Sequence, residues 1–384
     1  MTQKSPKDLY HIVTLPGDGI GPEVLNEAVK VLKAAGEKAG RFFEFEEIDC
    51  GGHYYAEHEV EWPEGSFERC KAADAILLGA VGHQIDGVDV FTKPGKPYDV
   101  PQLAGYAQVI DNRRKLNLYA NVRPVKMLPG IRAKVHGNFK EVWETGKVDY
   151  VVIRENTEDA YTGITTVMTD EKGESIGVES PIHITKEATE RVARYAFRMA
   201  KLRNPEDPTV HCVEKSNIIG AHRYFREVFD AVGAEEFPEV KREYAYFDAF
   251  CQWQTRSPEW FDVVVAPNLV GDVISDNGAM TAGGLGFSAG GNIGDEHGMF
   301  EPIHGSAPKY AGQDKVNPCA AILAAAMMAN WLGVRYKDSA LIQVSENIEA
   351  AVGKIIAEGK YRTYDLGGDT TCSGMGTAIA GALD

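Results

Sequence analysis

Two aspartates, Asp272 and Asp276, are the most distinctive chemical feature of this sequence. They lie in the segment Asn-Leu-Val-Gly-Asp-Val-Ile-Ser-Asp, residues 268–276, which follows a short apolar run ended by Pro267. A spacing of four puts both carboxylates on one helix face, where they repel unless a cation lies between them. Their hard oxygen donors suit Mg²⁺ or Mn²⁺, which often takes its remaining ligands from water and substrate. The alternative is a solvated helix start, with Asp272 placed for the helix dipole and Asp276 facing water.

Three arginines favour the metal site over the solvated helix. One lies on an otherwise apolar helix face, and the other two each end an apolar strand: Arg113, Arg123 and Arg154. A lone arginine is more often a surface residue whose stem packs on apolar neighbours. Here Tyr161 follows Arg154 by seven residues, and Lys215 and Asp248 come at the ends of later predicted strands. Together these side chains could bind a di- or tricarboxylate around a metal.

Length, charge and cysteine content restrict the class of protein. At 384 residues the chain is long enough for two domains, and 44% hydrophobic with 25% charged residues is typical of soluble globular proteins. The net charge, 40 − 56 = −16, argues against nucleic acid and membranes as partners. The six cysteines form no C-x-x-C pair, the start is polar, and the longest apolar run, residues 319–332, is short for a membrane span. We therefore expect a cytoplasmic protein.

Strand and helix patterns alternate along the chain, which predicts an α/β fold with a largely parallel sheet. Strands are predicted at residues 10–15, 42–48, 75–78, 119–124, 150–154, 209–213, 244–248 and 263–266. Helices are predicted at residues 22–35, 66–72, 103–116, 185–202 and 342–358, with a buried helix from Pro318. Residues 162–186 predict an arm of two strands, and residues 85–100 and 283–294 predict loops.

Four segments of the sequence resemble the β-decarboxylating dehydrogenase family, which holds isocitrate, 3-isopropylmalate, homoisocitrate and tartrate/D-malate dehydrogenases. They are Gly17-Asp-Gly-Ile-Gly-Pro22, Arg154-Glu-Asn-Thr-Glu-Asp-Ala-Tyr161, Asn268-Leu-Val-Gly-Asp-Val-Ile-Ser-Asp276 and His304-Gly-Ser-Ala-Pro308. The glycines at 17, 19 and 21 do not match G-x-G-x-x-G, and the family's fold is not a Rossmann fold. The resemblance implies a two-domain fold, with residues 1–118 and 284–384 as the outer, cofactor-side domain. Residues 119–283 would form the inner domain, with the arm, about 162–186, at the interface of a homodimer.

The resemblance also implies a role for each candidate side chain. The substrate would be bound by Arg113, Arg123 and Arg154, with Val109 and Asn217 nearby. The metal ligands would be Asp248, Asp272 and Asp276, of which the other subunit supplies Asp248. The catalytic pair would be Tyr161 and, again from the other subunit, Lys215. The adenine half of the cofactor would lie against His304, Gly305, Ser306, Ala307 and Asn317.

The reaction of that family explains these residue types. Hydride leaves C2 of a 2-hydroxy acid for the nicotinamide, while Lys215 would serve as the base that takes the hydroxyl proton. Mg²⁺ or Mn²⁺ polarises the new ketone so that the 3-carboxylate can leave as CO₂. Tyr161 then protonates the enolate at C3.

The segment after the adenine loop favours NADP as the cofactor. Residues 309–318 resemble NADP-dependent bacterial isocitrate dehydrogenases, in which the positions of Lys309 and Tyr310 contact the 2′-phosphate. Tyr364 also matches, but the arginine expected four residues later is Gly368. The alternative is NAD, with Lys309 as an ordinary surface lysine.

The substrate helix favours a different relative. Isocitrate enzymes carry Ser and Asn where this chain has Ala107 and Val109, and a valine cannot pair with a third carboxylate. Val109 and Ile110 resemble the apolar wall of isopropylmalate enzymes, so we expect a 3-isopropylmalate-like or D-malate-like substrate. The alternative is an NADP-dependent isocitrate or homoisocitrate dehydrogenase in which another group binds that carboxylate. The candidates for such a group are Gln108, Lys115 and the 85–100 loop.

Two other classes of function would reuse the same fold. One is a non-catalytic partner subunit of a hetero-oligomer, and the other is a small-molecule binding protein. Partner subunits typically lose metal or base residues, whereas all of them are present here. Binding alone does not require Lys215 and Tyr161, so the sequence favours an active enzyme.

Overall fold

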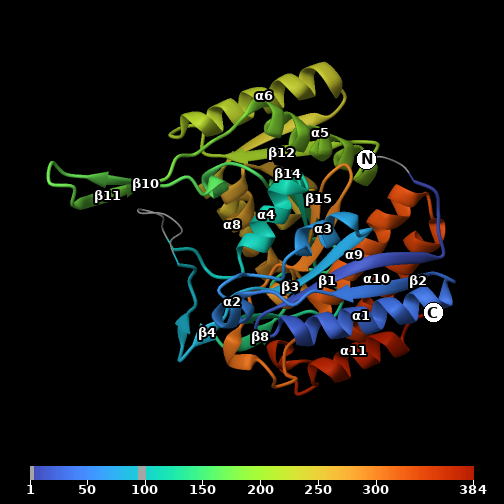
Figure 1. The fold of residues 1–384 in the computed structure, drawn as a ribbon. Coiled ribbons are helices and arrows are strands. Elements are labelled where there is room, and N and C mark those ends of the chain that lie inside the picture. Colours follow the sequence, from blue (N-terminus) through green and yellow to red (C-terminus); the bar gives the residue numbers. More distant parts are fainter. Residues whose placement is uncertain (1–3, 94–100) are drawn as a thin grey trace.

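The computed structural model describes residues 4–93 and 101–384, and its main feature is a ten-stranded sheet flanked by helices (Figure 1). The strand order is β13-β12-β14-β9-β6-β15-β16-β3-β1-β2. The strands are β13 (Lys241–Tyr246), β12 (Thr209–Glu214), β14 (Val263–Ala266), β9 (Asp149–Glu155), β6 (Ala120–Lys126), β15 (Ala289–Ile293), β16 (Gly298–Pro302), β3 (Ala75–Ala80), β1 (Leu9–Gly17) and β2 (Phe42–Glu47). Strands from residues 119–283 form one half of this sheet, and the predicted domain boundary would fall between β6 and β15.

The sheet is largely parallel, as expected, with an antiparallel section in its middle. The strands β13-β12-β14-β9 are parallel to one another, as are β16-β3-β1-β2, but β9-β6-β15-β16 pair antiparallel. Within this section β15 lies in the segment 283–294 that we predicted to be a loop, so that prediction was wrong. Its sequence Ala-Gly-Gly-Asn-Ile has low strand propensity. The ring of Phe300 packs so closely that a Cβ on Gly291 would lie 3.0 Å from it, so this buried strand uses its glycine to fit.

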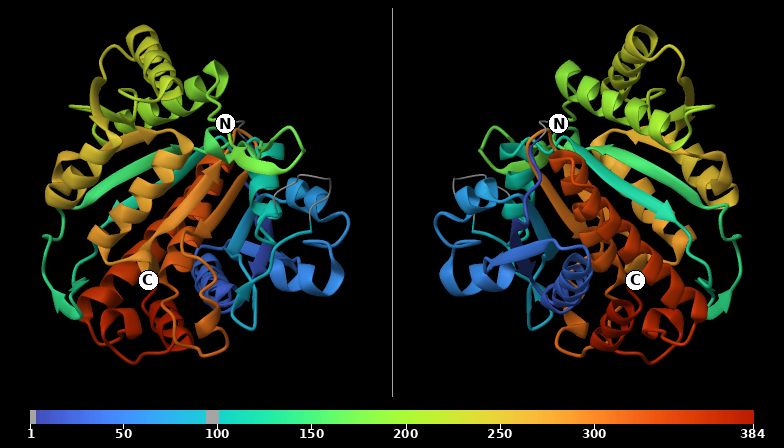
Figure 2. Two further views of the ribbon diagram at one scale, coloured as in Figure 1. Left: turned by 90° about the vertical axis from the view of Figure 1, so that its left-hand side faces the viewer. Right: turned by 90° about the vertical axis from the view of Figure 1, so that its right-hand side faces the viewer.

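Helices pack on the sheet in two groups, which Figure 2 shows at opposite ends of the molecule. The first group is α1 (Gly21–Lys38), α9 (Cys319–Tyr336), α10 (Ser339–Glu358) and α11 (Cys372–Gly381). The second is α5 (Lys186–Arg203) with α6 (Gly220–Glu236). The remaining helices are α2 (Gly52–His58), α3 (Ser66–Ala72), α4 (Ala107–Lys115), α7 (Phe247–Arg256) and α8 (Asn268–Ala279).

The apolar helix α9 lies inside the protein. It is long and apolar enough to cross a membrane by length and composition alone, and 78% of it is buried within the structure. The helix runs four residues beyond the apolar stretch that ends at Leu332. The prediction of a buried helix here is therefore confirmed. All six cysteines are free thiols.

The predicted arm is present as the two-stranded sheet β10 (Thr166–Thr169) and β11 (Ser175–Glu179), which projects away from the body of the protein (Figure 1). Ile176 and Val178 on this arm are exposed. Two further hairpins are β4 (Gln84–Ile85) with β5 (Val88–Asp89) and β7 (Ala133–Val135) with β8 (Asn138–Lys140). The β4–β5 hairpin begins the segment predicted as a loop at 85–100, of which residues 94–100 lie outside the described part.

Candidate active site

Two arginines meet the paired aspartates where β6, β9 and α8 come together. The Arg123 Nη1 atom lies 3.1 Å from an oxygen of Asp272 and 3.1 Å from an oxygen of Asp276. The guanidinium of Arg154 also pairs with Asp272, and its Nε donates to Asn268 Oδ1 at 2.8 Å. Opposite charges therefore separate the two carboxylates, which corrects the picture of a solvated helix start.

A glycine allows α8 to approach this closely. A Cβ on Gly271 would lie 2.7 Å from the Cβ of Arg154, a distance that real side chains do not reach. Helix α8 can therefore lie against β9 only with glycine at this position. This close approach aligns Asp272, one residue further along the helix, with the arginine that ends the strand.

Burial and charge separate the pKa values of the two aspartates. Burial acts to raise the pKa of Asp272, but Arg154 and Arg123 outweigh it and lower that pKa below its usual value. For Asp276, burial raises the pKa, and the opposing effect of Arg123 is too small to reverse it. Arg154 is 1% exposed. Its burial and the repulsion from Arg123 lower the pKa of its guanidinium to about 10, so it stays charged at neutral pH.

Tyr161 lies in the same cluster, on the 3₁₀ helix η1 (Ala160–Thr162). Its hydroxyl donates to Asp272 Oδ2 at 2.5 Å, and the guanidinium of Arg154 lies 5.0 Å from its ring centroid. Burial and the negative charge of Asp272 raise the pKa of Tyr161 well above its usual value. The phenol therefore keeps its proton at neutral pH.

Arg113 joins the site from α4. Its Nη2 lies 3.2 Å from an oxygen of Glu301 on β16, and both side chains are buried. The Nε atom of Arg113 is buried without a hydrogen-bond partner among the described residues. A buried donor without a partner is costly, so this arginine has capacity left for a ligand.

The two apolar residues of α4, Val109 and Ile110, differ in burial. Val109 is 3% exposed and packs in a core cluster with Leu15 and Met299, so it contributes to the interior. Ile110 is half-buried and is the more accessible of the two apolar residues.

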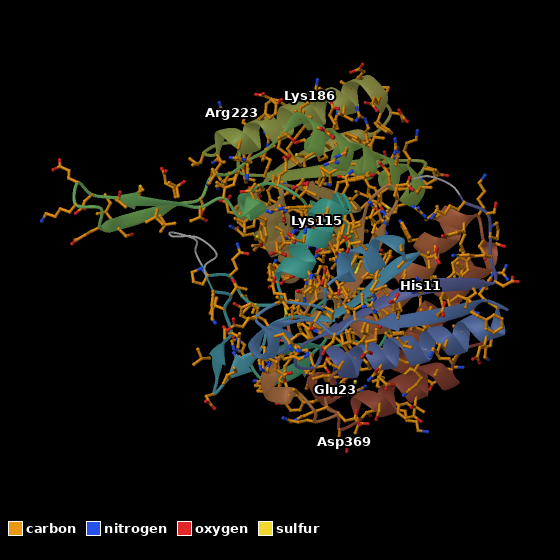
Figure 3. All side chains as sticks on the ribbon, in the orientation of Figure 1. His11, Glu23, Lys115, Lys186, Arg223 and Asp369 are labelled. Atoms are coloured by element: carbon orange, nitrogen blue, oxygen red, sulfur yellow. The ribbon has the colours of Figure 1, made fainter. Side chains whose placement is uncertain are left out.

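The three groups that could have bound a third carboxylate have different surroundings. Gln108 is buried, and both of its amide atoms are without a partner among the described residues. Lys115, labelled in Figure 3, is exposed and pairs with Asp111 at 2.9 Å. The remaining candidate, the 85–100 loop, is only partly described.

Lys215 and Asp248 lie apart from the arginine cluster and contact each other. Lys215 Nζ donates to Asp248 Oδ1 at 2.5 Å, and the Asp248 side chain is 67% exposed. Asp248 is in the first turn of α7 and not at the end of a strand as predicted. Asn217, in the same loop as Lys215, is also exposed. Within the described part of the chain, no three His, Cys, Asp or Glu side chains form a metal-binding group.

The predicted adenine loop is held in place by the glycine turn at residues 17–21. The Ile20 N–H donates to the carbonyl oxygen of Ser306 at 2.8 Å, and a Cβ on Gly19 would lie 2.1 Å from that same oxygen. Ser306 Oγ donates to the carbonyl of Gly82 at 2.5 Å. The turn therefore has the structural role that we expected of it.

His304 fits a ligand in this loop. Its Nε2 is buried without a partner among the described residues, and burial lowers the pKa of the ring. Ala307 has a left-handed backbone, with φ of 40°. Asn317, by contrast, is already used, because its Nδ2 donates to Asp365 at 3.0 Å. A neutral imidazole with a free nitrogen suits the hydrogen-bonding edge of a purine.

A group of lysines and tyrosines extends from this loop. Lys309 Nζ lies 4.7 Å from the ring centroid of Tyr310, and that ring lies 6.4 Å from Tyr364. Two lysines that we did not predict flank Tyr364, with Nζ atoms at 4.3 Å for Lys315 and 5.6 Å for Lys134. Lys315 lay within the resemblance, but only the fold could bring in Lys134 from the β7–β8 hairpin.

The arginine expected near this group could not fit at its position. A Cβ on Gly368 would lie 2.2 Å from the carbonyl oxygen of Arg362, so only glycine is accommodated there. Lys315 and Lys134 place positive charge beside the Tyr364 ring in the same region.

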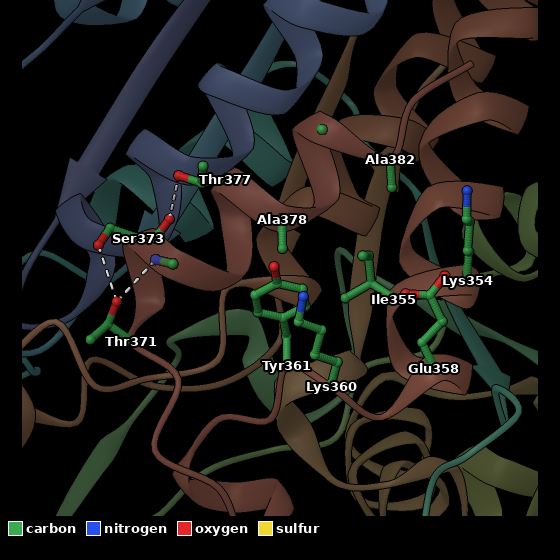
Figure 4. Close-up of a pocket in the computed structure, with 12 residues that line it drawn as sticks. Lys354, Ile355, Glu358, Lys360, Tyr361, Thr371, Ser373, Thr377, Ala378 and Ala382 are labelled. Carbon is green, nitrogen blue, oxygen red and sulfur yellow. Dashed lines mark hydrogen bonds between the residues drawn. The ribbon is translucent and has the colours of Figure 1, made fainter.

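A hollow of about 600 Å³ between α10 and α11 shares no residue with the site described above (Figure 4). Thr371, Ser373 and Thr377 are hydrogen-bonded in a row along it, and Lys354 and Lys360 stand at its edge. It has no arginine and no pair of carboxylates.

The fold and the site together define an α/β enzyme built to bind a polycarboxylate. The model of the family "Isocitrate/isopropylmalate dehydrogenase" matches residues 11–379. The chain is 38% identical over 384 residues to a 3-isopropylmalate dehydrogenase of Carboxydothermus hydrogenoformans, covering 99% of this chain and 96% of the relative. It is 33% identical over 373 residues to a decarboxylating D-malate dehydrogenase of Escherichia coli, covering 96% and 97%. The crystal structure of an isocitrate dehydrogenase from Methylococcus capsulatus superposes with a TM-score of 0.81 at 31% identity, covering 97% and 99%.

The chain belongs to the isocitrate/isopropylmalate dehydrogenase family. It is accordingly an oxidoreductase of the β-decarboxylating type, as the resemblance implied. The family acts on small hydroxy acids and implies a nicotinamide cofactor and a divalent metal.

Proposed function

We propose that this protein is a homodimeric dehydrogenase that oxidises and decarboxylates a malate with a small apolar group, or none, at C3. The observation that carries the proposal is the cluster of Arg123, Arg154, Asp272, Asp276 and Tyr161. In the isolated chain the two aspartates form ion pairs with the two arginines, so the guanidinium groups are already partnered. With a divalent cation on the aspartates, the two guanidiniums would become free to bind substrate carboxylates as forks.

The residues present fit the metal and the nicotinamide cofactor that the family implies. Asp272 and Asp276 offer hard oxygen donors one helical turn apart, and Asp248 of the partner subunit would add a third. When bound, the metal would polarise the ketone oxygen, and the nicotinamide would accept the hydride from C2. The cofactor's adenine would lie against the loop of residues 304–308, where His304 Nε2 has no partner among the described residues.

Proton transfer would be divided between two residues of this chain. The partner's Lys215 would take the proton of the C2 hydroxyl as the general base. Tyr161 keeps its proton because its pKa is raised by burial and by Asp272. It can therefore deliver that proton to C3 after CO₂ has left.

Several exposed groups support a homodimer with shared sites. Lys215 and Asp248 pair with each other, and the Asp248 side chain is 67% exposed. Large apolar side chains on α7 and α8 are exposed on the chain by itself, namely Trp253, Leu269 and Val273. Covering such a patch with a second copy would bury these residues and bring the missing base to the site. Free cysteines throughout the chain support the cytoplasm as the location.

Two observations support the proposed substrate class. The relatives at 38% and 33% identity act, by their names, on 3-isopropylmalate and D-malate. On α4, Ile110 offers an apolar contact one turn before Arg113, and each methylene buried there would add about 0.8 kcal/mol of binding. A third carboxylate at this place would lose its hydration without gaining a partner.

A second candidate is an NADP-dependent isocitrate or homoisocitrate dehydrogenase. It is favoured by the likeness to the isocitrate dehydrogenase structure and by the buried amide of Gln108, which has no partner among the described residues. The deciding experiment measures kcat/KM for 3-isopropylmalate, D-malate and isocitrate, with NADP and with NAD, by absorbance at about 340 nm. We expect 3-isopropylmalate or D-malate to exceed isocitrate, and a clear excess for isocitrate would establish the second candidate instead.

We propose NADP as the preferred cofactor. Lys309, Lys315 and Lys134 surround the ring pair of Tyr310 and Tyr364, and a 2′-phosphate carries nearly two negative charges. Three cations at one place compensate for the absent arginine at position 368.

A further inference from the structure

His222 lies buried in the first turn of α6, and its two ring nitrogens face different parts of the proposed active site. The backbone N–H of Lys215 donates to Nδ1 at 3.1 Å. Nδ1 therefore carries no proton, and the neutral ring must hold its proton on Nε2. This Nε2 lies 3.7 Å from Oδ1 of Asp159. Arg223, the next residue on α6, marks this region in Figure 3.

Asp159 connects the same ring to the metal-binding helix. Its other oxygen, Oδ2, accepts the N–H of Leu269 in the first turn of α8 at 2.8 Å. Its backbone pairs with His183 where the arm rejoins the body, with an N–H to oxygen distance of 2.7 Å. Asp159 is two residues before Tyr161 in the chain.

The backbone of Asp159 is in a conformation that residues with side chains rarely adopt. Its φ is 66° and its ψ is −135°, in a region that favours glycine. Both Asp159 and His222 are nine-tenths or more buried. Oδ1 and Nε2 have no hydrogen bond to any other described residue, and a shift of about half an ångström would join them. The contacts that the Asp159 carboxylate makes with Leu269 and towards His222 therefore compensate for this unfavourable backbone conformation.

We propose that His222 and Asp159 are positioning residues that hold the Lys215 loop in register with α8 and Tyr161. The inference rests on the proposed roles of Lys215 and Asp272. If Lys215 serves the partner's site while Tyr161 and Asp272 serve their own, the His222–Asp159 pair links the two active sites of the dimer. Neither residue touches the substrate, so the effect is on the geometry of Lys215 and not on binding.

The first test uses His222→Asn in the full-length protein. The asparagine Oδ1 can replace Nδ1 as the acceptor for the Lys215 N–H, but the shorter side chain does not reach Asp159. We expect kcat to fall about tenfold, with the KM values for substrate and cofactor within about twofold and the unfolding midpoint near that of the wild type. His222→Gln extends a donor towards Asp159 but leaves the Lys215 N–H without its acceptor, so it breaks the other end of the link and should lower kcat by a similar factor.

A matched control is His211→Asn on β12, whose ring packs on Phe261 at 4.9 Å and lies outside the proposed link. This variant should keep the wild-type kcat. Wild-type kcat in a folded His222→Asn variant would overturn the proposal, as would equal losses in His222→Asn and His211→Asn.

Asp159→Asn provides an independent measurement if the His222 variants fold poorly. The amide oxygen can still accept the Leu269 N–H, but the carboxylate that faces His222 is lost. The double variant His222→Asn with Asp159→Asn should lose no more kcat than the stronger single variant, because both break the same link. Additive losses would show that the two residues act separately.

A heterodimer distinguishes this inference from the proposed function. Mixed Lys215→Ala and Asp272→Ala subunits would contain one complete site, with Lys215 from one chain and Asp272 from the other. His222→Asn should lower the turnover of that site at least fivefold more in the Lys215-supplying chain than in the other chain. Equal losses from both placements would overturn the positioning role. No activity in the unmodified mixture would overturn the shared site alone, and the homodimer kcat would still decide the positioning role.

Discussion

The proposed active site contains two pairs of opposite charges that are built in opposite ways. Arg154 is buried, and its partner Asp272 has a side chain that is 30% exposed; a buried charge like that of Arg154 must be paired within the chain to be tolerated. In the second pair neither residue is buried: Lys215 is 26% exposed and Asp248 is 67% exposed, so solvent screens their contact and it adds little to stability. The first pair is complete in one chain, whereas the second would gain its function only in the proposed dimer. The difference indicates which part of the site one chain can form and which part needs two.

The largest expected effect is a difference in stability between a variant of the first pair and a variant of the second. Arg154→Ala would leave Asp272 beside Arg123 with one partner lost and a cavity behind it, costing about 3 kcal/mol of stability and abolishing activity. Lys215→Ala should abolish activity while the free energy of unfolding stays at the wild-type value. Urea denaturation and initial rates of both variants measure the contrast. Unchanged stability in Arg154→Ala, or turnover in Lys215→Ala, would refute it.

Chelation tests the same contrast without a mutation. Excess EDTA should abolish activity, and Mn²⁺ or Mg²⁺ should restore it, because Asp272 and Asp276 are the proposed metal ligands. The unfolding midpoint should change little on chelation, since Arg123 and Arg154 already neutralise the aspartates in the metal-free chain. Undiminished turnover in EDTA would contradict the metal assignment.

The sequence predicted the secondary-structure positions of Arg154 and Asp272 better than that of Asp248, and the reasons are physical. Arg154 and Asp272 lie at a strand end and one turn into a helix, so the α/β pattern alone places them at the same edge of the sheet. Asp248 was assigned to a strand because Tyr244 to Tyr246 are apolar or aromatic, yet it begins α7. Periodicity does not show where a strand ends when a helix follows without a turn.

Other errors came from packing that no local pattern records. The glycine-rich strand β15 forms because both its neighbours in the sheet supply backbone partners, which outweighs its low propensity. His222 and Asp159 are 63 residues apart in sequence (222 − 159), so only the fold could bring them together.

A smaller effect is expected for the lysines of the proposed cofactor region. Solvent screens their charges, as it does those of Lys215 and Asp248. Lys315→Ala should lower kcat/KM for NADP about tenfold, the effect of losing one charge-assisted contact, and leave kcat/KM for NAD within about twofold. Lys360→Ala is the matched control, because that lysine lies over Tyr361, outside the proposed cofactor region. A wild type that prefers NAD by a wide margin would contradict the NADP assignment outright.

The measurement that tests the account most directly is complementation between two inactive variants. Lys215→Ala and Asp272→Ala subunits, unfolded together and refolded, should form mixed dimers in which one site has both residues. About a quarter of the wild-type activity is expected if subunits pair at random, because half of the dimers are mixed and each has one complete site of two. Each variant refolded alone should stay inactive. Mixed dimers that are shown to form and remain inactive would contradict the claim that two chains share each active site.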